Sequence, residues 1–560
     1  MRKVIASLCV LVAVLATQAV RPEARAQAEA APKQGLVCAT GPSFDLTATS
    51  GYAETPDGNS VLMWSYAPTG GGFQSPGPTL CVEQGDRVTV RLHNDLAEPV
   101  SIVLPGQSGV EETGSPGPLA AQAPPKGEAT YTFTADEPGT YLYESGSDPS
   151  KQVEMGLYGA LVVRPRDRPD QAYDAASRFD PSREYLMLLS DIDPDLHHAV
   201  ETGGVYDFTT LRNRYFAING RQFPDTLQNN GVPWLPAQPY GALVRVKPYD
   251  ATTNPLPALI RMVNVGALNH PFHPHGNHVR QIAQDGRRLR TPEGGDAGGE
   301  HFGDTVASGQ TQDFLFTWKD QDSWDPQGNP LPASVASPDY RNLTFKNGDT
   351  WSSGSAYLGA KGTLPVGTTS QNVCGEWYFP WHSHALNEFT NFDAGFGGMA
   401  TLLRVDPPGG CAAVAGSSVI LAGTPESGSA AALASADSSY YQVTSTTTET
   451  PAADWYGGFA GVPAGASALT VTYTGHNPAG TLPTTLWAWR WSTGTWVRLG
   501  AETGVGTSDT MITRVLPAPQ PDFLGTGANQ GKVRIRVLTT GTTTGFLTRG
   551  NLLKLTYDAP

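Results

Sequence analysis

The sequence has 560 residues, of which 39% are hydrophobic and 16% are charged, and it contains 63 glycines and 46 prolines. This length predicts about three to four domains, and the abundant glycine and proline favour turn-rich β domains over helical bundles or disordered chain. The formal net charge of −15 argues against nucleic acid or an anionic membrane as the main partner.

The N-terminus has the pattern of an export signal. Arg2 and Lys3 precede the apolar run 4–16, which is too short to span a bilayer and remain there. The triplet Ala24-Arg25-Ala26 places small residues at both positions that determine cleavage, so residues 1–26 are predicted to be a signal peptide. We therefore expect a secreted or periplasmic protein with no membrane segment after cleavage.

Cysteine usage agrees with export. Cys9 lies within the signal, and the other four cysteines form an even set of the kind that pairs in an oxidising compartment: Cys38, Cys81, Cys374 and Cys411. Four cysteines allow three pairings. We prefer Cys38 with Cys81 and Cys374 with Cys411, because this choice places one bridge in each of two domains.

Short alternating apolar runs between turn signals predict strands in two successive β domains. The first domain, residues 37–166, has predicted strands at 79–82, 87–92, 129–133 and 157–163. The second, residues 182–406, has predicted strands at 185–189, 242–246, 259–263, 314–317 and 399–405. Both domains are therefore expected to be all-β.

The composition changes after the boundary segment Asp406-Pro-Pro-Gly-Gly-Cys411, where serine, threonine and glycine become abundant. Residues 416–560 are predicted to be a separate β-sandwich, with strands at 468–473, 486–491, 532–537 and 553–557. Trp487, Trp489 and Trp491 alternate onto one face of a strand. We expect them in the sandwich core, where aromatic side chains dominate; the alternative is an aromatic platform that contacts polysaccharide or a cell surface.

Two other polar patterns are weak. Asp191-Ile-Asp-Pro-Asp195 lacks the glycine and the distal glutamate of a calcium loop, so we expect a surface turn. His197, His198 and His301 are isolated and are given no role.

Two short pieces that together hold five histidines are the strongest chemical signal. One piece is His270-Pro-Phe-His-Pro-His275, and the other is Trp381-His-Ser-His384. Strand side chains alternate between faces, so each His-x-His pair shares one face. If the two strands are neighbours, the four imidazoles of His273, His275, His382 and His384 converge, which suits copper or zinc.

The first piece resembles the third copper motif of the multicopper oxidases, and the second resembles the fourth motif, normally His-Cys-His. Residues 139–163 and 99–106 resemble the stretches that carry the second and first motifs, and 215–224 is another family-like stretch. This resemblance covers about residues 40 to 406. It implies two cupredoxin-like Greek-key β-barrels, which the C-terminal β-sandwich then follows.

Only 126 residues separate Glu144 from His270, which leaves no room for a middle cupredoxin domain. The similarity is therefore to the two-domain members of the family. Those members characteristically form trimers with copper at the subunit or domain interface, so the resemblance implies a homotrimer.

The sequence departs from the family pattern at most copper ligands. The histidines of the first motif align with Val103 and Pro105, and those of the second align with Glu144 and Gly146. The type 1 copper cysteine aligns with Ser383, and a further type 1 histidine aligns with Glu388. Of the type 1 set only His270 remains, with Met399 as a remote axial candidate. The retained trinuclear-cluster ligands all lie in the second domain: His273, His275, His382 and His384.

These losses limit the chemistry that the resemblance implies. A type 1 site needs a thiolate as ligand and as electron path, and the Ser383 hydroxyl cannot replace it. We therefore expect a secreted copper-binding protein that holds one or two copper ions on the four retained imidazoles, with His270 nearby. Glu144 is a further candidate ligand; the alternative is a solvated surface acid, because unpaired acids are rarely buried.

Two alternatives stay open. The first is a copper-dependent oxidoreductase that acts at a reduced cluster, with Glu144 as an unusual ligand. The second is a metal-free secreted scaffold or matrix protein, in which the C-terminal module is the adhesive part. Bound metal and oxygen consumption distinguish these hypotheses.

Overall fold

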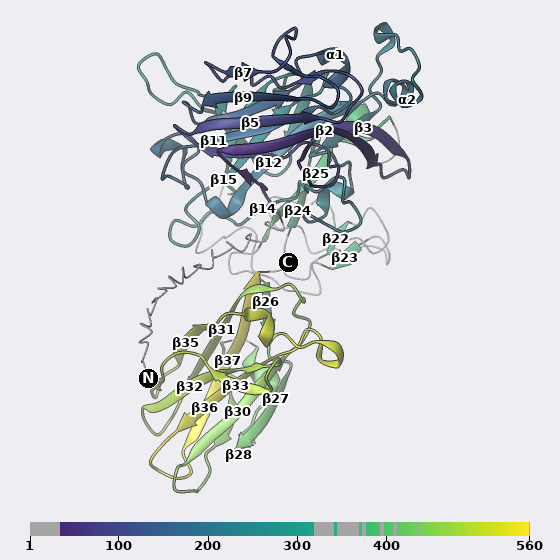
Figure 1. The fold of residues 1–560 in the computed structure, drawn as a ribbon. Coiled ribbons are helices and arrows are strands. Elements are labelled where there is room, and N and C mark those ends of the chain that lie inside the picture. The colour runs from purple at the N-terminus through teal and green to yellow at the C-terminus, as the bar shows by residue number, and fades with distance from the viewer. Residues whose placement is uncertain are drawn as a thin grey trace, which may run out of the picture.

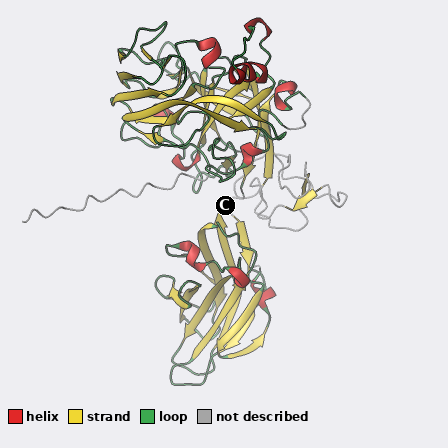
Figure 2. Ribbon diagram, turned by 45° about the vertical axis from the view of Figure 1, so that its right-hand side comes forward, coloured by secondary structure: helices red, strands yellow, loops and turns green. Residues whose placement is uncertain are grey.

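The structure, a computed structural model, describes residues 34–318, 377–392, 397–406, 411–434 and 436–558, together with the backbone of 341–343 and 369–371. The predicted signal peptide and Cys374 lie outside the described residues. The described chain forms β domains throughout, as predicted. Two of them pack together in the upper part of Figure 1, and the C-terminal one forms the separate lower part. Figure 2 shows that helices are few and short in all three.

The first domain is built from two main sheets, with strand orders β3-β2-β5-β9-β7 and β1-β4-β11-β10, and a short pair β6-β8. Every second residue of β5 and β9 is buried, which is the period of a half-buried strand. These residues fill a core between the sheets. The elements are β1 (Ala39–Thr40), β2 (Ser43–Glu54), β3 (Ser60–Pro68), β4 (Leu80–Glu83), β5 (Arg87–Asn94), β6 (Val100–Ser101), β7 (Glu111–Thr113), β8 (Gln122–Ala123), β9 (Glu128–Thr134), β10 (Gly139–Glu144), α1 (Pro149–Gln152) and β11 (Tyr158–Arg164).

The second domain also has two main sheets. One has the order β13-β12-β15-β21-β17-β18 with β19 beside β17, and the other has the order β14-β25-β24-β16-β20. The second sheet carries both histidine pieces. The elements are β12 (Glu184–Ile192), α2 (Pro194–Thr202), β13 (Tyr215–Ile218), β14 (Val244–Val246), β15 (Ala258–Asn264), β16 (His270–Pro274), β17 (Val279–Gln284), β18 (Arg287–Arg288), β19 (Gly299–His301), β20 (Asp304–Val306), β21 (Thr311–Phe316), β22 (Arg341–Leu343), β23 (Thr369–Gln371), β24 (Trp377–Ser383), α3 (Leu386–Phe389) and β25 (Ala400–Val405).

The C-terminal domain is a sandwich of two six-stranded sheets. One has the order β28-β29-β37-β31-β35 with β26 beside β37, and the other has the order β27-β30-β36-β32-β33 with β34 beside β32. The elements are β26 (Cys411–Val414), β27 (Ser417–Ala422), β28 (Thr424–Ser427), β29 (Tyr441–Thr444), β30 (Ala452–Phe459), β31 (Ser467–His476), β32 (Leu482–Arg490), β33 (Thr495–Arg498), β34 (Thr503–Val505), β35 (Thr510–Val515), β36 (Val533–Thr540) and β37 (Leu547–Asp558).

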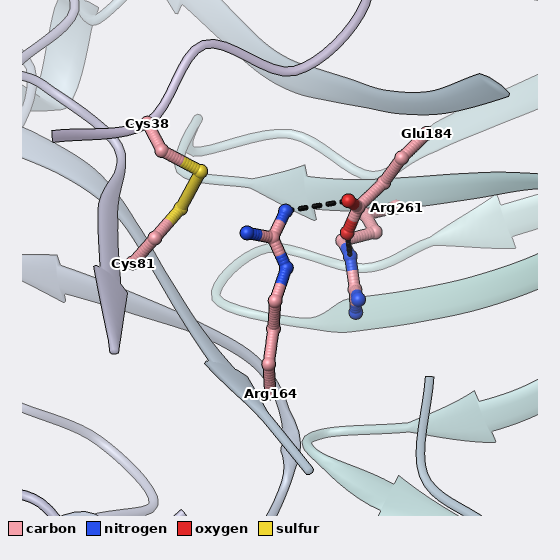
Figure 3. The surroundings of a disulfide bond; sticks show 5 residues. All are labelled: Cys38, Cys81, Arg164, Glu184 and Arg261. Atoms are coloured by element: carbon pink, nitrogen blue, oxygen red, sulfur yellow. Dashed lines mark hydrogen bonds and ion pairs between the residues drawn. A yellow bond between two sulfur atoms is a disulfide. The ribbon is translucent and has the colours of Figure 1, made fainter. Parts of the chain in front are cut away.

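A disulfide joins Cys38 to Cys81, which confirms the first predicted pairing. It ties the segment before β1 to β4, which is paired in parallel with both β1 and β11. Figure 3 shows this bridge beside Arg164, Glu184 and Arg261. The second predicted pairing involves Cys374 and stays a prediction.

Buried ion pairs join the first two domains. Glu184 at the start of β12 accepts hydrogen bonds from Arg164 of the first domain, at 2.5 Å, and from Arg261 of β15, at 2.8 Å (Figure 3). Arg261 is completely buried, and it also lies 3.6 Å from the carboxylate of Asp313. Burial opposes ionisation of Glu184, but the two guanidinium groups outweigh burial and lower its pKa. At the domain interface, the positive charges of Arg164 and Arg261 therefore balance the negative charges of the buried carboxylates.

The predicted core position of the three tryptophans is wrong. In β32 the residues that face the core are Leu486 and Ala488, which are buried in the sandwich cluster. Trp487, Trp489 and Trp491 point the other way and are half-buried on the outer face of their sheet. The strand has the expected two-residue period, but the larger side chains occupy the face opposite to the core.

The predicted surface turn at 191–195 is also wrong. Asp191 lies within the buried strand β12, next to its last residue, and Asp193 caps α2 by accepting a hydrogen bond from the backbone N–H of Asp195. The Asp191 carboxylate accepts from the backbone N–H groups of Ala267 and Leu268. Gly266 allows this close packing, because a Cβ there would lie 1.7 Å from Asp191 Oδ1.

Candidate metal centre

The two histidine pieces lie on neighbouring antiparallel strands. β16 pairs with β24 so that His273 is directly opposite His382, and Phe272 is opposite Ser383. The chain continues this pairing beyond both strands, since the backbone N–H of His275 donates to Pro380 and that of His384 donates to Pro271. The cross-strand register, rather than proximity in sequence, brings the two pieces together.

Strand alternation divides these residues between two faces. His273 and His382 share one face of the sheet, and His275 and His384 extend the same face by one residue at the end of each strand. His270 and Ser383 belong to the opposite face, and both are completely buried. The single sheet therefore carries a histidine cluster on one side and a second polar group on the other.

The four rings of the cluster are close neighbours. The ring of His273 lies 4.8 Å from that of His275, 5.9 Å from that of His382 and 5.2 Å from that of His384, measured between centroids. The Nε2 atoms of His275 and His382 are 3.1 Å apart. We name this group, His273, His275, His382 and His384, the histidine cluster.

Hydrogen bonds to backbone carbonyl oxygens fix the position of the ring proton in two of the four histidines. The Nδ1–H of His273 donates to the carbonyl oxygen of Phe302, and that of His382 donates to the carbonyl oxygen of Ser383 at 2.7 Å. A carbonyl only accepts, so each ring carries its proton on Nδ1 and presents Nε2 as a lone pair. Phe302 lies in the short link between β19 and β20, and the sequence gave no signal of this role.

The cluster favours neutral imidazole. Burial and, to a smaller extent, charge repulsion from the neighbouring rings of His382, His273 and His384 together lower the pKa of His275 to about 4. Burial also lowers the pKa of His382. Neutral imidazole is the form that binds metal ions. Stacking of the His382 ring on Phe389, at 4.5 Å between centroids, helps to hold it in place.

A pocket of about 310 Å³ opens beside the cluster, and its lining includes His273, His275, His278 and Phe302. Phe302 is 70% exposed at its rim, and its ring lies 6.4 Å from that of His278. His278 is exposed and belongs to the pocket wall rather than to the four-ring group. Small solutes and ions can therefore reach the cluster from solvent.

The donor set fits copper or zinc in its chemistry and in one of its distances. Two nitrogens held at roughly 2.0 Å from a tetrahedral ion are about 3.3 Å apart, close to the 3.1 Å between His275 and His382. Within the described residues, no group of three or more histidine, cysteine or acidic side chains already has a metal-holding arrangement. A third ligand from His273 or His384 therefore requires a change of side-chain position.

A different arrangement occupies the buried side of the sheet. Glu388 Oε2 accepts hydrogen bonds from His270 Nδ1, at 2.9 Å, and from Ser383 Oγ. The backbone of Met399 adjoins this group, because Met399 N–H donates to Glu388 and its carbonyl accepts from Ser383. The imidazole and the hydroxyl both hydrogen-bond to the carboxylate here, and none of the three groups is a thiolate. This group does not fit a type 1 copper ion.

Glu144 does not join the histidine cluster. It ends β10 in the first domain, where its backbone pairs with Val103. Gly146 packs beside them, since a Cβ there would lie 2.5 Å from Val103 Cγ1. Among the described residues, no hydrogen bond or ion pair links Glu144 to the four histidines. Burial raises the pKa of the Glu144 carboxyl, and its role as a ligand stays a hypothesis.

Comparison with known proteins matches the first domain most clearly. Residues 67–168 match a family model described as multicopper oxidase. A multicopper oxidase of Cercospora beticola, CTB12, is 36% identical over 119 residues, which are 21% of this chain and 18% of that protein. Copper resistance protein A of Escherichia coli is 32% identical over 130 residues, 22% of this chain and 19% of that protein. The chain thus matches about a fifth of the length of these relatives.

Solved structures give a more distant likeness. The structure described as multicopper oxidase mgLAC has a TM-score of 0.44 and 19% identity, over 65% of this chain and 86% of that one. The histidine cluster lies outside residues 67–168. Its assignment therefore depends on the geometry of β16 and β24.

Proposed function

Because this chain is a member of the multicopper oxidase and cupredoxin-like family, we propose that its second domain binds copper through the histidine cluster. The observation that carries the proposal is the register of β16 and β24, which sets His273 opposite His382 and brings four imidazoles to one face. We propose a copper-binding protein without a type 1 centre. It holds one copper ion, or two.

The protonation pattern supports this proposal. His273 and His382 present Nε2 lone pairs, because their Nδ1–H groups are engaged by carbonyls. His275 contributes a third nitrogen, 3.1 Å from that of His382. His384 is exposed at the end of the strand, so its ring can turn toward an ion without disturbing the core. Bound copper would supply one-electron redox chemistry at this site.

The buried group limits what such a site can do. The copper oxidases of the family pass electrons from an outer substrate through a type 1 thiolate, and here Ser383 hydrogen-bonds to Glu388 in place of such a ligand. Copper binding is therefore the preferred function, rather than oxidase activity. Copper-dependent oxidoreductase activity at a reduced cluster is the second candidate, favoured by the open pocket beside the histidine cluster.

The proposal includes export and assembly. The predicted signal peptide at residues 1–26 directs the chain to the periplasm or the cell exterior, where copper proteins encounter their metal. Within the described residues, no helix is long and apolar enough to cross a bilayer. We propose a homotrimer in which Glu144 approaches the histidine cluster of a neighbouring subunit, since the two are not joined within one chain.

Metal analysis of the full chain tests the proposal. We expect the purified protein to retain copper after dialysis, to give a type 2 EPR signal and to lack the intense blue absorption of a copper thiolate. His382→Ala and His275→Ala should lose the metal. His198→Ala is the matched control, because its exposed ring belongs to α2 and lies outside the cluster.

Three outcomes separate the candidate functions. Copper retained by His198→Ala and lost from His382→Ala supports the site. Oxygen consumption with phenols or metal ions supports the oxidoreductase function if it disappears in His382→Ala. Absence of bound copper even after copper is added contradicts the proposal and favours the metal-free scaffold.

A further inference from the structure

The outer face of one C-terminal sheet carries an unusual set of side chains. The strands lie side by side in the order β27-β30-β36-β32-β33, and the lower part of Figure 1 shows the domain that contains them. Their register aligns two cross-strand rows on the face away from the core. The first row is Val419, Tyr456, Arg536, Trp487 and Arg498. The second row has Ser417, Gly458 and Arg534 on one side and Trp489 and Trp496 on the other, and the Arg534 guanidinium lies 6.0 Å from the ring centroid of Trp489.

Trp496 contacts two other aromatic side chains of these rows. The ring of Trp496 lies 5.2 Å from that of Trp489 and 5.6 Å from that of Tyr456, between centroids. Trp491 follows directly after β32, and all these rings are half-buried rather than enclosed. We name Tyr456, Trp487, Trp489, Trp491 and Trp496 the aromatic face. A group of partly exposed aromatic rings on the outer face of a folded domain is typical of an interaction surface.

The two arginines of the face have different partners. Arg536 is neutralised, because its guanidinium makes two hydrogen bonds with the carboxylate of Asp454, at 2.7 and 2.6 Å. Arg534 has no carboxylate within ion-pair distance among the described residues. Its guanidinium lies over Trp491, at 4.6 Å from the ring centroid, and 5.5 Å from that of Tyr456. The rings hold the Arg534 cation in place without neutralising it.

A guanidinium stacked on rings keeps its N–H edge for a ligand, and that edge matches the two oxygens of a carboxylate or sulfate. The surrounding rings favour flat, weakly polar ligand faces. Sugar rings combine an apolar C–H face with polar edges. We propose that the aromatic face and Arg534 bind an acidic polysaccharide, with sugar rings against the tryptophans and an anionic group on Arg534.

Charge favours this ligand over nucleic acid. Residues 411–558 contain eight basic and eight acidic residues, so the domain lacks the net positive charge that is typical of nucleic-acid-binding domains. A single unpaired arginine among aromatic rings suits a polymer with spaced carboxylates. The inference concerns the C-terminal domain alone and does not depend on copper binding.

Affinity electrophoresis of the full chain tests the inference. Polygalacturonate in the gel is the acidic probe, hydroxyethyl cellulose is the neutral probe and poly(U) is the nucleic-acid probe. We expect retardation by polygalacturonate, weakened at least about tenfold in Arg534→Gln. Lys532→Gln is the matched control, because it removes one positive charge from the neighbourhood of β36 without touching the aromatic face.

Trp489→Leu tests the stacking surface, and thermal unfolding of every variant tests for folding defects. Retardation lost in both Arg534→Gln and Trp489→Leu, and kept in Lys532→Gln, supports the proposal. It is overturned by absence of retardation, by equal loss in Lys532→Gln or by no change in either test variant. Equal retardation by hydroxyethyl cellulose, or stronger retardation by poly(U), also overturns it.

Discussion

His270 donates from Nδ1 to Glu388 Oε2 at 2.9 Å, and both side chains are buried. Ser383 Oγ donates to the same carboxylate oxygen. The resemblance to multicopper oxidases aligns these three residues with type 1 ligands. Three groups that the resemblance aligns with metal ligands thus bind one another directly in this chain, and the carboxylate joins β16, β24 and α3.

Glu388→Ala should destabilise the second domain. It would leave the His270 N–H and the Ser383 hydroxyl as buried donors without their acceptor, which costs about 2–5 kcal/mol. Chemical denaturation monitored by tryptophan fluorescence measures the loss. Glu293→Ala is the control, because that carboxylate is exposed. Equal stability of the two variants would contradict a structural role for the buried group.

The double variant Ser383→Cys, Glu388→His should create a blue copper site. It places a thiolate and a second imidazole beside His270, next to the backbone of Met399, and this is the ligand set of type 1 copper. Visible absorption after copper addition measures the result, with Ser383→Cys alone as the comparison. A colourless double variant that folds normally would show that the alignment of Glu388 with the type 1 histidine is mistaken.

Arg261→Met should weaken the interface between the first two domains. The variant would leave Glu184 and Asp313 as buried acids without their shared cation, a loss of about 3–5 kcal/mol. Arg87→Met is the control, since its ion pair with Glu111 is exposed and contributes about 0–1 kcal/mol. Urea unfolding of both variants gives the comparison. Similar effects would show that burial of the Arg261 network adds nothing.

Stability should fall as the pH rises toward 8, through Glu154. Burial, helped by the charges of Asp191 and Asp193, raises the pKa of Glu154 from 4.5 to about 8. The folded protein therefore binds a proton that the unfolded chain releases above about pH 4.5, and the associated stability is lost as the pH passes through 8. Burial lowers the pKa of the adjacent His197, which has the opposite effect below about pH 6.5.

Glu154→Gln separates the two contributions. The amide keeps an oxygen to accept the hydrogen bond from the backbone N–H of Asp193, but it does not ionise. Between pH 6.5 and 8.5 the wild-type free energy of unfolding should decline by roughly 1–3 kcal/mol more than that of the variant. Parallel urea titrations measure the difference. Identical slopes would show that Glu154 ionises normally in the folded state.

Much of the fold was predictable because strand periodicity is a local property. The runs predicted at 87–92 and 129–133, for example, are β5 and β9, in which every second side chain is buried. The spacing of each His-x-His pair likewise fixed which histidines share a face. Copper binding itself stays a prediction.

The errors arose where tertiary packing decides the outcome. Alternation placed Trp487 and Trp489 on one face correctly, but it could not tell which face meets the other sheet; Leu486 and Ala488 do. The Glu388 hydrogen bonds and the carbonyl of Phe302 depend on chain segments distant in sequence. No pattern of spacing reports such contacts.

One peptide bond links the two polar groups of the second domain. His382 faces the pocket side of β24, and the next residue, Ser383, faces the sealed interior. A metal ion that displaces the His382 side chain would therefore also affect the hydrogen bond between the Ser383 hydroxyl and Glu388. The histidine cluster and the buried Ser383–Glu388 pair share the backbone of β24. Redesign of either group must therefore preserve that backbone.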